Sequence, residues 1–97
     1  MSYKVIVELR LKNGKLQDFF DWCKPFCETI RNADGCIKIE IGITQNNQNN
    51  CFIIQEWNNF QNYEDYFFEF EKTGLWRSLA RHILNDPKIT FCHFSEM

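Results

Sequence analysis

The chain has 97 residues, of which 16% are aromatic, and a formal net charge of −2 at pH 7. Its length fits one domain, residues 1–97, and the lack of a basic run argues against nucleic-acid binding. Lys4, Glu8 and Arg10 interrupt the first apolar run, so we expect no secretory signal, and no stretch nears the ~18 apolar residues of a membrane span. Five cysteines without close pairing favour a reducing compartment, so we expect a cytoplasmic protein.

The first two predicted elements are a strand and a helix. Every second residue from Tyr3 to Leu11 is apolar, and those between them are polar except Ile6. This period of two predicts a strand with one apolar face. From Leu16 to Ile30 the apolar residues follow helical spacing. Pro25 has no backbone N–H, so we expect a bend or a late restart there. Gly35, after Asp34, can adopt the positive φ that ends a helix.

A central hairpin follows. Its first strand carries an apolar face made of Ile37, Ile39, Ile41 and Ile43. Residues 44–50, TQNNQNN, are too polar to pack and predict the turn. Residues 51–57, CFIIQEW, form the returning strand.

The last third of the chain predicts a helix, a shorter helical segment and a strand. Asn58 can cap the helix, with Gln61 completing a capping box. One helical face is aromatic and is expected in the core: Phe60, Tyr63, Phe67 and Phe70. A final helical piece is predicted over 75–84, and a last strand over 88–94.

The order strand, helix, strand, strand, helix, strand predicts an α+β fold, the ferredoxin-like βαββαβ arrangement. Right-handed crossovers put both helices on one face of a four-stranded antiparallel sheet. The other face has no helix to cover it, so it meets either water or a second sheet. Because the aromatic content is high, we expect a homodimer through this open face.

Three segments resemble one known family. They are VIVELRLKNGKLQDF, TIRNADGC and FIIQEWNNFQNYEDY, and in this order and spacing they are similar to the antibiotic biosynthesis monooxygenase and quinol monooxygenase group. The resemblance implies a dimeric α+β barrel. It also implies oxidation of a quinol or polyphenolic aromatic molecule by O₂, without metal, flavin or haem.

The resemblance also implies site residues. Trp57, Tyr63 and Arg77 match positions of anthrone-oxidising members. By this likeness Trp57 would stack on the substrate ring and Tyr63 would donate to a substrate oxygen, while Arg77 would stabilise a phenolate or peroxide anion. We therefore predict Tyr63 and Arg77 as catalytic residues.

Four residues are predicted to bind substrate: Trp57, Tyr66, Trp76 and His82. Tyr66 stands where many quinol-oxidising relatives carry a histidine. Trp76 stands where haem-degrading relatives carry the axial histidine, and it cannot ligate iron, which disfavours haem degradation. His82 and His93 are either general bases or structural residues.

Two alternatives stay open. Ile53 and Trp76 replace polar residues of active relatives, which leaves a non-catalytic dimeric module that binds a small ligand or a partner. The second alternative is an enzyme with another reaction on the same scaffold, such as an isomerase or a dehalogenating lyase. We expect no metal site, because Cys23 and Cys27 share an apolar helical stripe.

Overall fold

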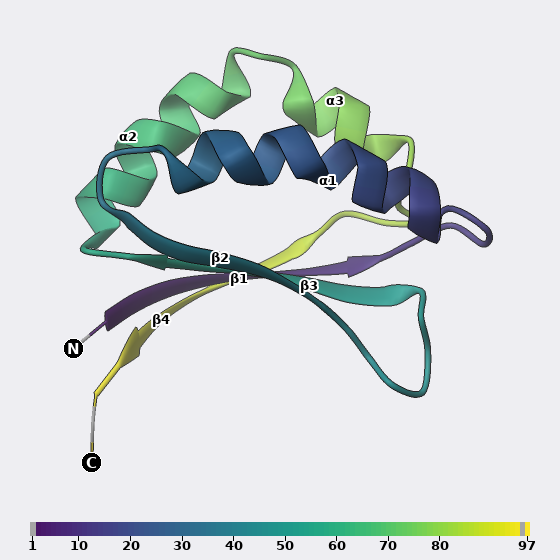
Figure 1. The fold of residues 1–97 in the computed structure, drawn as a ribbon, viewed down its shortest axis with the longest axis horizontal. Coiled ribbons are helices and arrows are strands. Elements are labelled where there is room, and N and C mark those ends of the chain that lie inside the picture. Colours follow the sequence, from purple (N-terminus) through teal and green to yellow (C-terminus); the bar gives the residue numbers. More distant parts are fainter. Residues whose placement is uncertain (1, 96) are drawn as a thin grey trace.

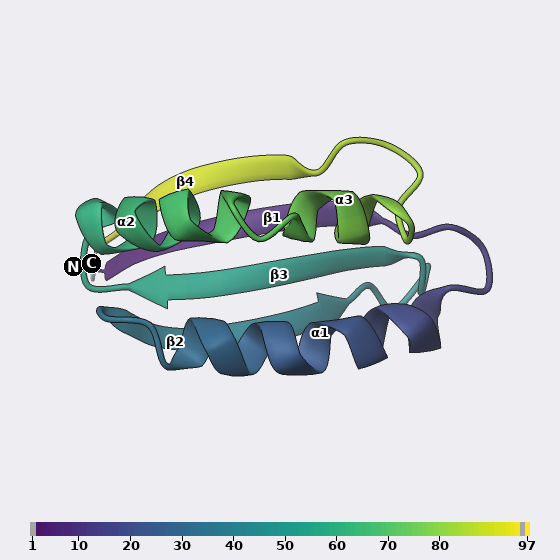
Figure 2. The same ribbon diagram turned by 90° about the horizontal axis from the view of Figure 1, so that it is seen from above.

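Four strands form one antiparallel sheet in the order β2-β3-β1-β4, and three helices cover one face of it (Figures 1 and 2). The computed structural model describes residues 2–95 and 97. Its elements are β1 (Ser2–Arg10), α1 (Leu16–Arg31), β2 (Cys36–Ile43), β3 (Asn50–Trp57), α2 (Phe60–Glu71), α3 (Leu75–Ala80) and β4 (Lys88–Phe94). The predicted ferredoxin-like βαββαβ fold is confirmed, with α3 as a short third helix.

The alternating face of β1 forms the centre of the core. Its inward side chains are all buried: Tyr3, Val5, Val7 and Leu9, followed by Leu11. Buried residues of β3 lie beside them in register, as Val7 opposite Ile53 and Leu9 opposite Cys51. Figure 2 shows α1 along the β2–β3 side of the sheet and α2 with α3 along the β1–β4 side. The helices therefore bury the face that the period of two predicted.

The isoleucine face of β2 differs from the prediction. A register shift between Cys36 and Lys38 adds one residue to β2, so that Ile37 leaves the alternation. Ile37 is 54% exposed and Ile43, near the turn, is 38% exposed, whereas Ile39 is buried. The expectation that all four isoleucines pack under the helices is therefore wrong at both ends of the strand.

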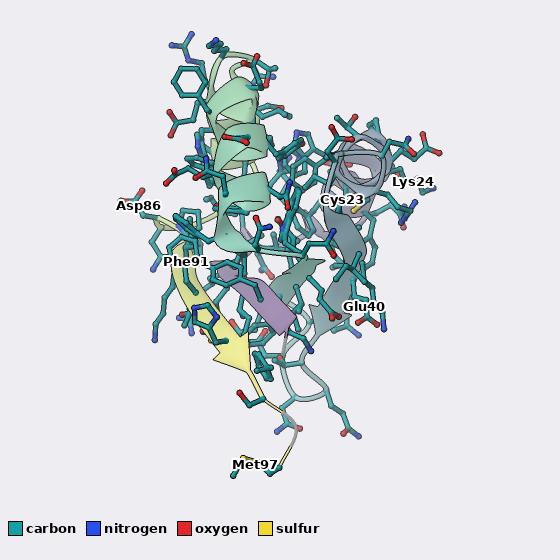
Figure 3. All side chains as sticks on the ribbon, turned by 90° about the vertical axis from the view of Figure 1, so that its left-hand side faces the viewer. Cys23, Lys24, Glu40, Asp86, Phe91 and Met97 are labelled. Atoms are coloured by element: carbon teal, nitrogen blue, oxygen red, sulfur yellow. The ribbon has the colours of Figure 1, made fainter. Side chains whose placement is uncertain are left out.

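Helix α1 continues through Pro25 without a break in its assigned span, so the expected late restart does not occur. Proline removes one backbone hydrogen bond of the helix. The hydroxyl of Thr29 donates to the Pro25 carbonyl at 3.0 Å. Five apolar side chains on the inner face are buried and hold the helix on the sheet: Phe19, Cys23, Phe26, Cys27 and Ile30. Figure 3 shows Cys23 beneath α1 and Glu40 lower down, on β2.

The start of α2 also differs from the prediction. The cap is Asn59, whose side chain accepts from the Asn62 backbone N–H at 2.9 Å, and not Asn58. The Asn58 N–H instead donates to the carbonyl of Gly35 at 2.8 Å. Gly35 has the expected positive φ of 84°, and a Cβ at this position would overlap the Asn62 side chain. The turn after α1 and the start of α2 are therefore packed together at a glycine.

Two further expectations for this part of the chain are wrong. Phe60 is 41% exposed, because it lies in the first turn of α2, beyond the buried stripe that Tyr63 and Phe70 form. The last helical piece ends at Ala80, after which the chain turns and Ile83 pairs with Leu11 in an isolated bridge. None of the helices in residues 2–95 has the length and apolar character that a membrane span requires.

Candidate functional site

A narrow cavity lies between the three helices and the sheet. It holds about 450 Å³ of empty space including its mouth, but the centre of a water molecule can occupy only about 30 Å³ of it. Its walls come from β1, β3 and β4 below and from all three helices above. The lining residues are Val7, Trp22, Phe26, Ile30, Ile53, Gln55, Tyr63, Tyr66, Phe67, Phe70, Trp76, Leu79 and Ile89. Mostly apolar walls with a few polar groups are typical of small-molecule sites.

The cavity has uncharged polar groups and no charged ones. Gln55 from β3 and two hydroxyls from α2, those of Tyr63 and Tyr66, are in the lining together with two tryptophan indoles. No Asp, Glu, Lys, Arg or His of the described residues lines it. The site can therefore offer hydrogen-bond donors to a ligand, but it has no carboxylate or imidazole to act as a general base.

Burial keeps both tyrosines protonated. Burial, with smaller contributions from Tyr3 and Glu71, raises the pKa of Tyr63 to about 12. Burial, with smaller contributions from Cys36 and Cys27, raises the pKa of Tyr66 to about 12 as well. Desolvation disfavours the phenolate, so both hydroxyls remain neutral at pH 7 and can donate a hydrogen bond.

Trp57 supports the wall of the cavity from behind. It is fully buried at the end of β3, and its ring lies 5.8 Å from that of Tyr63 and 5.7 Å from that of Tyr66. Its indole N–H donates to Oε1 of Gln55 at 3.0 Å. Trp57 is not part of the lining, so in this closed form it positions the three polar residues and does not face a ligand.

Trp76 lies between the cavity and an outer groove, as does Ile89. The half-buried Trp76 lines the cavity and also an open groove on the α3–β4 side, which Ala80, Ile83, Asp86, Pro87 and Ile89 complete. Its ring meets Phe67 and Phe70 edge-on, at 5.8 and 5.7 Å. Among the described residues, its indole N–H has no hydrogen-bond partner, unlike that of Trp22, which donates to Ser78 at 2.8 Å.

The remaining predicted residues lie outside the cavity. Arg77 is exposed on α3 and makes no ion pair within the described residues. His82 follows α3, and its ring lies 6.3 Å from that of Phe19 and 6.0 Å from that of Trp22. Its Nδ1 is buried and has no hydrogen-bond partner in the part of the chain that the structure describes. His93 lies on β4, an outer strand of the sheet, and packs against Tyr3 of β1. The structure thus brings together Tyr63, Tyr66 and Trp76 around the cavity, with Trp57 behind them.

Sequence reasoning did not select Gln55. The available signal was its place in β3, where inward positions are otherwise apolar: Cys51, Ile53 and Trp57. A polar residue on such a face needs a partner or a function.

Burial raises the pKa of four of the five cysteine thiols, those of Cys23, Cys27, Cys36 and Cys51. All five cysteines are free. Burial, with smaller contributions from the neighbouring Cys27 and Cys51, raises the pKa of Cys23 to about 12. A thiol with a raised pKa is a poor nucleophile. In residues 2–95 and 97, no group of three or more His, Cys, Asp or Glu side chains could hold a metal ion.

The family model described as antibiotic biosynthesis monooxygenase matches residues 2–82 of the chain. This match extends from β1 to the segment just after α3 and includes every cavity residue except Ile89. No curated protein matches the sequence.

Several solved structures share the fold. A conserved protein from Methanosarcina mazei Go1 superposes with a TM-score of 0.89 at 17% identity, covering 98% of this chain and 94% of that one. SnoaB, a cofactor-independent oxygenase from Streptomyces nogalater that was solved as a mutant, superposes with a TM-score of 0.87 at 7% identity. The match covers 99% of this chain and 95% of SnoaB. A protein from Mycobacterium tuberculosis superposes with a TM-score of 0.85 at 7% identity, covering 100% of this chain and 98% of that one. At these identities the likeness extends to the fold alone.

Proposed function

Because the chain belongs to the antibiotic biosynthesis monooxygenase family, we propose that it is a cofactor-independent monooxygenase that oxidises a quinol or polyphenolic aromatic compound with O₂. The observation that carries this proposal is the aromatic cavity, whose polar groups are uncharged donors. Such walls suit a flat ring, and such donors suit an oxygen at its edge. The five free cysteines are consistent with a cytoplasmic location.

The proposed reaction depends on the substrate's own reducing power. An ionised polyphenol gives one electron to O₂, and the resulting aryloxyl radical and superoxide combine into a peroxide at a ring carbon. Loss of water from this peroxide leaves a carbonyl, so that one oxygen atom stays in the product. The other leaves as water, which takes the hydrogen of that ring carbon and a proton from solvent that replaces the one lost when the phenol ionised. Because no base lines the cavity, the substrate enters as the phenolate already formed in water.

The protein's part in this proposal is to bind the anion and exclude water. Tyr63 and Tyr66 donate to the anionic oxygen, and the surrounding rings keep bulk water from the radical pair. Arg77 remains our second catalytic candidate, since it follows Trp76 directly on a helix of six residues. A shift of α3 is needed to bring its guanidinium to the cavity.

A bound ring requires more space than the closed cavity offers, because ligand pockets usually measure about 300–1,000 Å³. We therefore propose that Trp76 swings toward the outer groove when the substrate enters. This displacement joins the cavity to a groove in which water centres can occupy about 340 Å³.

The closed state also favours a second function, a module that binds a small aromatic ligand without turnover. Recovery of a bound quinol unchanged under air would support that alternative.

We propose a homodimer through the open face of the sheet. At its centre the half-buried Ile6 and Ile54 face each other in register, and charged residues surround them, such as the Lys38–Glu40 ion pair at 3.2 Å. We expect the native protein to sediment as a dimer and Ile54→Lys as a monomer, because an unpaired charge at the centre of an interface is costly. Sedimentation of the native protein as a monomer would contradict the proposal.

Oxygen uptake tests the catalytic proposal. We expect the native protein to consume O₂ with a naphthoquinol or an anthrone, and Tyr63→Phe to lower kcat by about 10²-fold, as for loss of one donor to a developing anion. Arg77→Gln is expected to lower kcat as well.

Matched controls are available for both changes. Tyr3→Phe is the control for Tyr63→Phe, because it makes the same change at a buried tyrosine outside the cavity. Arg81→Gln is the control for Arg77→Gln, at the exposed C-cap of α3. Neither should alter kcat. No uptake across a panel of quinols and anthrones would contradict the enzyme, and turnover that survives both Tyr63→Phe and Arg77→Gln would remove the roles given to those residues.

A further inference from the structure

Gln55 is a polar side chain on an apolar surface. It faces the helices from the middle of β3, with Val5 opposite on β1 and Ile39 opposite on β2, both of them buried. Gln55 itself is only 5% exposed. Burying an amide without hydrogen bonds costs free energy, so the position of each of its two polar atoms is informative.

One half of the amide is committed to the protein. Oε1 accepts the indole N–H of Trp57 at 3.0 Å, and Trp57 is fully buried. Because an indole can only donate, it must face the oxygen of the amide and not the nitrogen. Trp57 therefore fixes which way the amide is turned.

The other half of the amide is free. Within the described residues, Nε2 donates to no acceptor, although Gln55 is part of the cavity lining. Its two hydrogens therefore lie at the wall of a cavity whose other polar side chains are the Tyr63 and Tyr66 hydroxyls and the indoles of Trp22 and Trp76. A nitrogen of this kind cannot accept a hydrogen bond.

We propose that Gln55 determines the specificity of the cavity by donating from Nε2 to an oxygen of the bound aromatic compound. The oxygen that meets Gln55 must accept a hydrogen bond, and a phenolate or a quinone-type carbonyl is a stronger acceptor than a neutral phenol hydroxyl. This inference rests on the proposed function for the aromatic nature of the ligand. It goes further in stating which form of the ligand binds and which residue selects it.

Electrostatics within the site agree with this selection. The titratable groups that face Gln55 across the cavity are Tyr63 and Tyr66 of α2, and both keep their protons because burial raises each pKa to about 12. The thiols of Cys27 on α1 and Cys36 on β2 lie near Tyr66, and burial raises the pKa of each of them. No negative charge of the lining therefore opposes a phenolate.

The experiment compares 2-naphthol with naphthalene, which has the same rings without the oxygen. Binding is measured under argon, so that no turnover occurs, and the absorbance spectrum reports how much of the bound naphthol is ionised. We expect the native protein to bind the naphtholate more tightly than naphthalene and to lower the pKa of the bound naphthol.

Two substitutions of Gln55 isolate the role of Nε2. Gln55→Glu keeps an acceptor for Trp57 but replaces the donor by an oxygen, and we expect the Kd of the naphtholate to rise about tenfold or more, while that of naphthalene stays the same. Gln55→Leu should weaken naphtholate binding by a similar factor, and its melting temperature shows how much of this effect comes from lost stability. Val5→Ile, a change beside Gln55 that leaves the amide intact, should not alter the preference for the naphtholate.

The possible outcomes separate this inference from the proposed function. Equal binding of the naphtholate and naphthalene by the native protein, or an unchanged preference in Gln55→Glu, overturns the role of Gln55 and leaves the aromatic site standing. Failure of the native protein to bind either compound overturns both proposals. A naphtholate preference in a protein that consumes no O₂ with any quinol or anthrone of the panel supports the inference and contradicts catalysis.

Discussion

Replacing Trp76 with alanine should lower the Kd for flat aromatic ligands by about tenfold, because the indole separates the cavity from the groove between α3 and β4. When the open form is a minor state, the apparent Kd equals the Kd of the open form divided by the fraction of molecules that are open. An open population of about 10% gives the tenfold change. Removing the indole makes every molecule open and removes this cost.

The control for Trp76 is a smaller change at the same position. Trp76→Phe keeps a ring against Phe67 and Phe70 and should lie between the native protein and the alanine variant in affinity. Phe68→Ala removes a ring that is 61% exposed on α2 and should leave the affinity unchanged. Titration with 2-naphthol measures all three. An alanine variant that binds no more tightly than the native protein would show that Trp76 does not limit entry.

Replacing Trp57 with alanine should lower the free energy of unfolding by about 3–5 kcal/mol, the usual cost of truncating a buried tryptophan. Trp57 is among the largest fully buried side chains, and both cavity tyrosines pack against its ring. Domains of this size are stabilised by about 5–15 kcal/mol, so the loss is a large fraction of the total stability. Urea denaturation measures the loss.

Trp57→Phe keeps part of the ring and serves as the second variant. It leaves Oε1 of Gln55 without a donor, for which we expect a loss of about 1–3 kcal/mol. Leu84→Ala changes a side chain that is 61% exposed and should have little effect. If Trp57→Ala unfolds at the same urea concentration as the native protein, Trp57 does not hold the β3 wall of the cavity.

The elements of the fold follow from local patterns, whereas the corrections depend on contacts between elements. A period of two places β1, and the predicted last strand, residues 88–94, coincides with β4. Ile37 was misplaced because the register shift of β2 depends on how it pairs with β3. Asn58 and Asn59 can both cap a helix, and the choice depends on where β3 ends. Gly35 adds to this constraint, because its carbonyl binds the Asn58 N–H.

The candidate site was predictable in its aromatic composition but not in its depth. The helical spacing of Tyr63, Phe67 and Phe70 places them above the sheet, and the structure brings all three to the cavity. The exposure of Arg77 and the closed position of Trp76 depend on how α3 turns after Gly74, which has a φ of 75°. The role of Gln55 depends on a contact with Trp57, two positions along the same strand, that a residue pattern does not reveal.

The whole lining of the cavity comes from the helix-covered side of the sheet. Two copies joined through their bare sheets would each keep a complete and separate reaction chamber. Saturation with substrate would then follow a simple hyperbola, without cooperativity. A hybrid assembled from one native and one disabled subunit would retain half the turnover of the native pair.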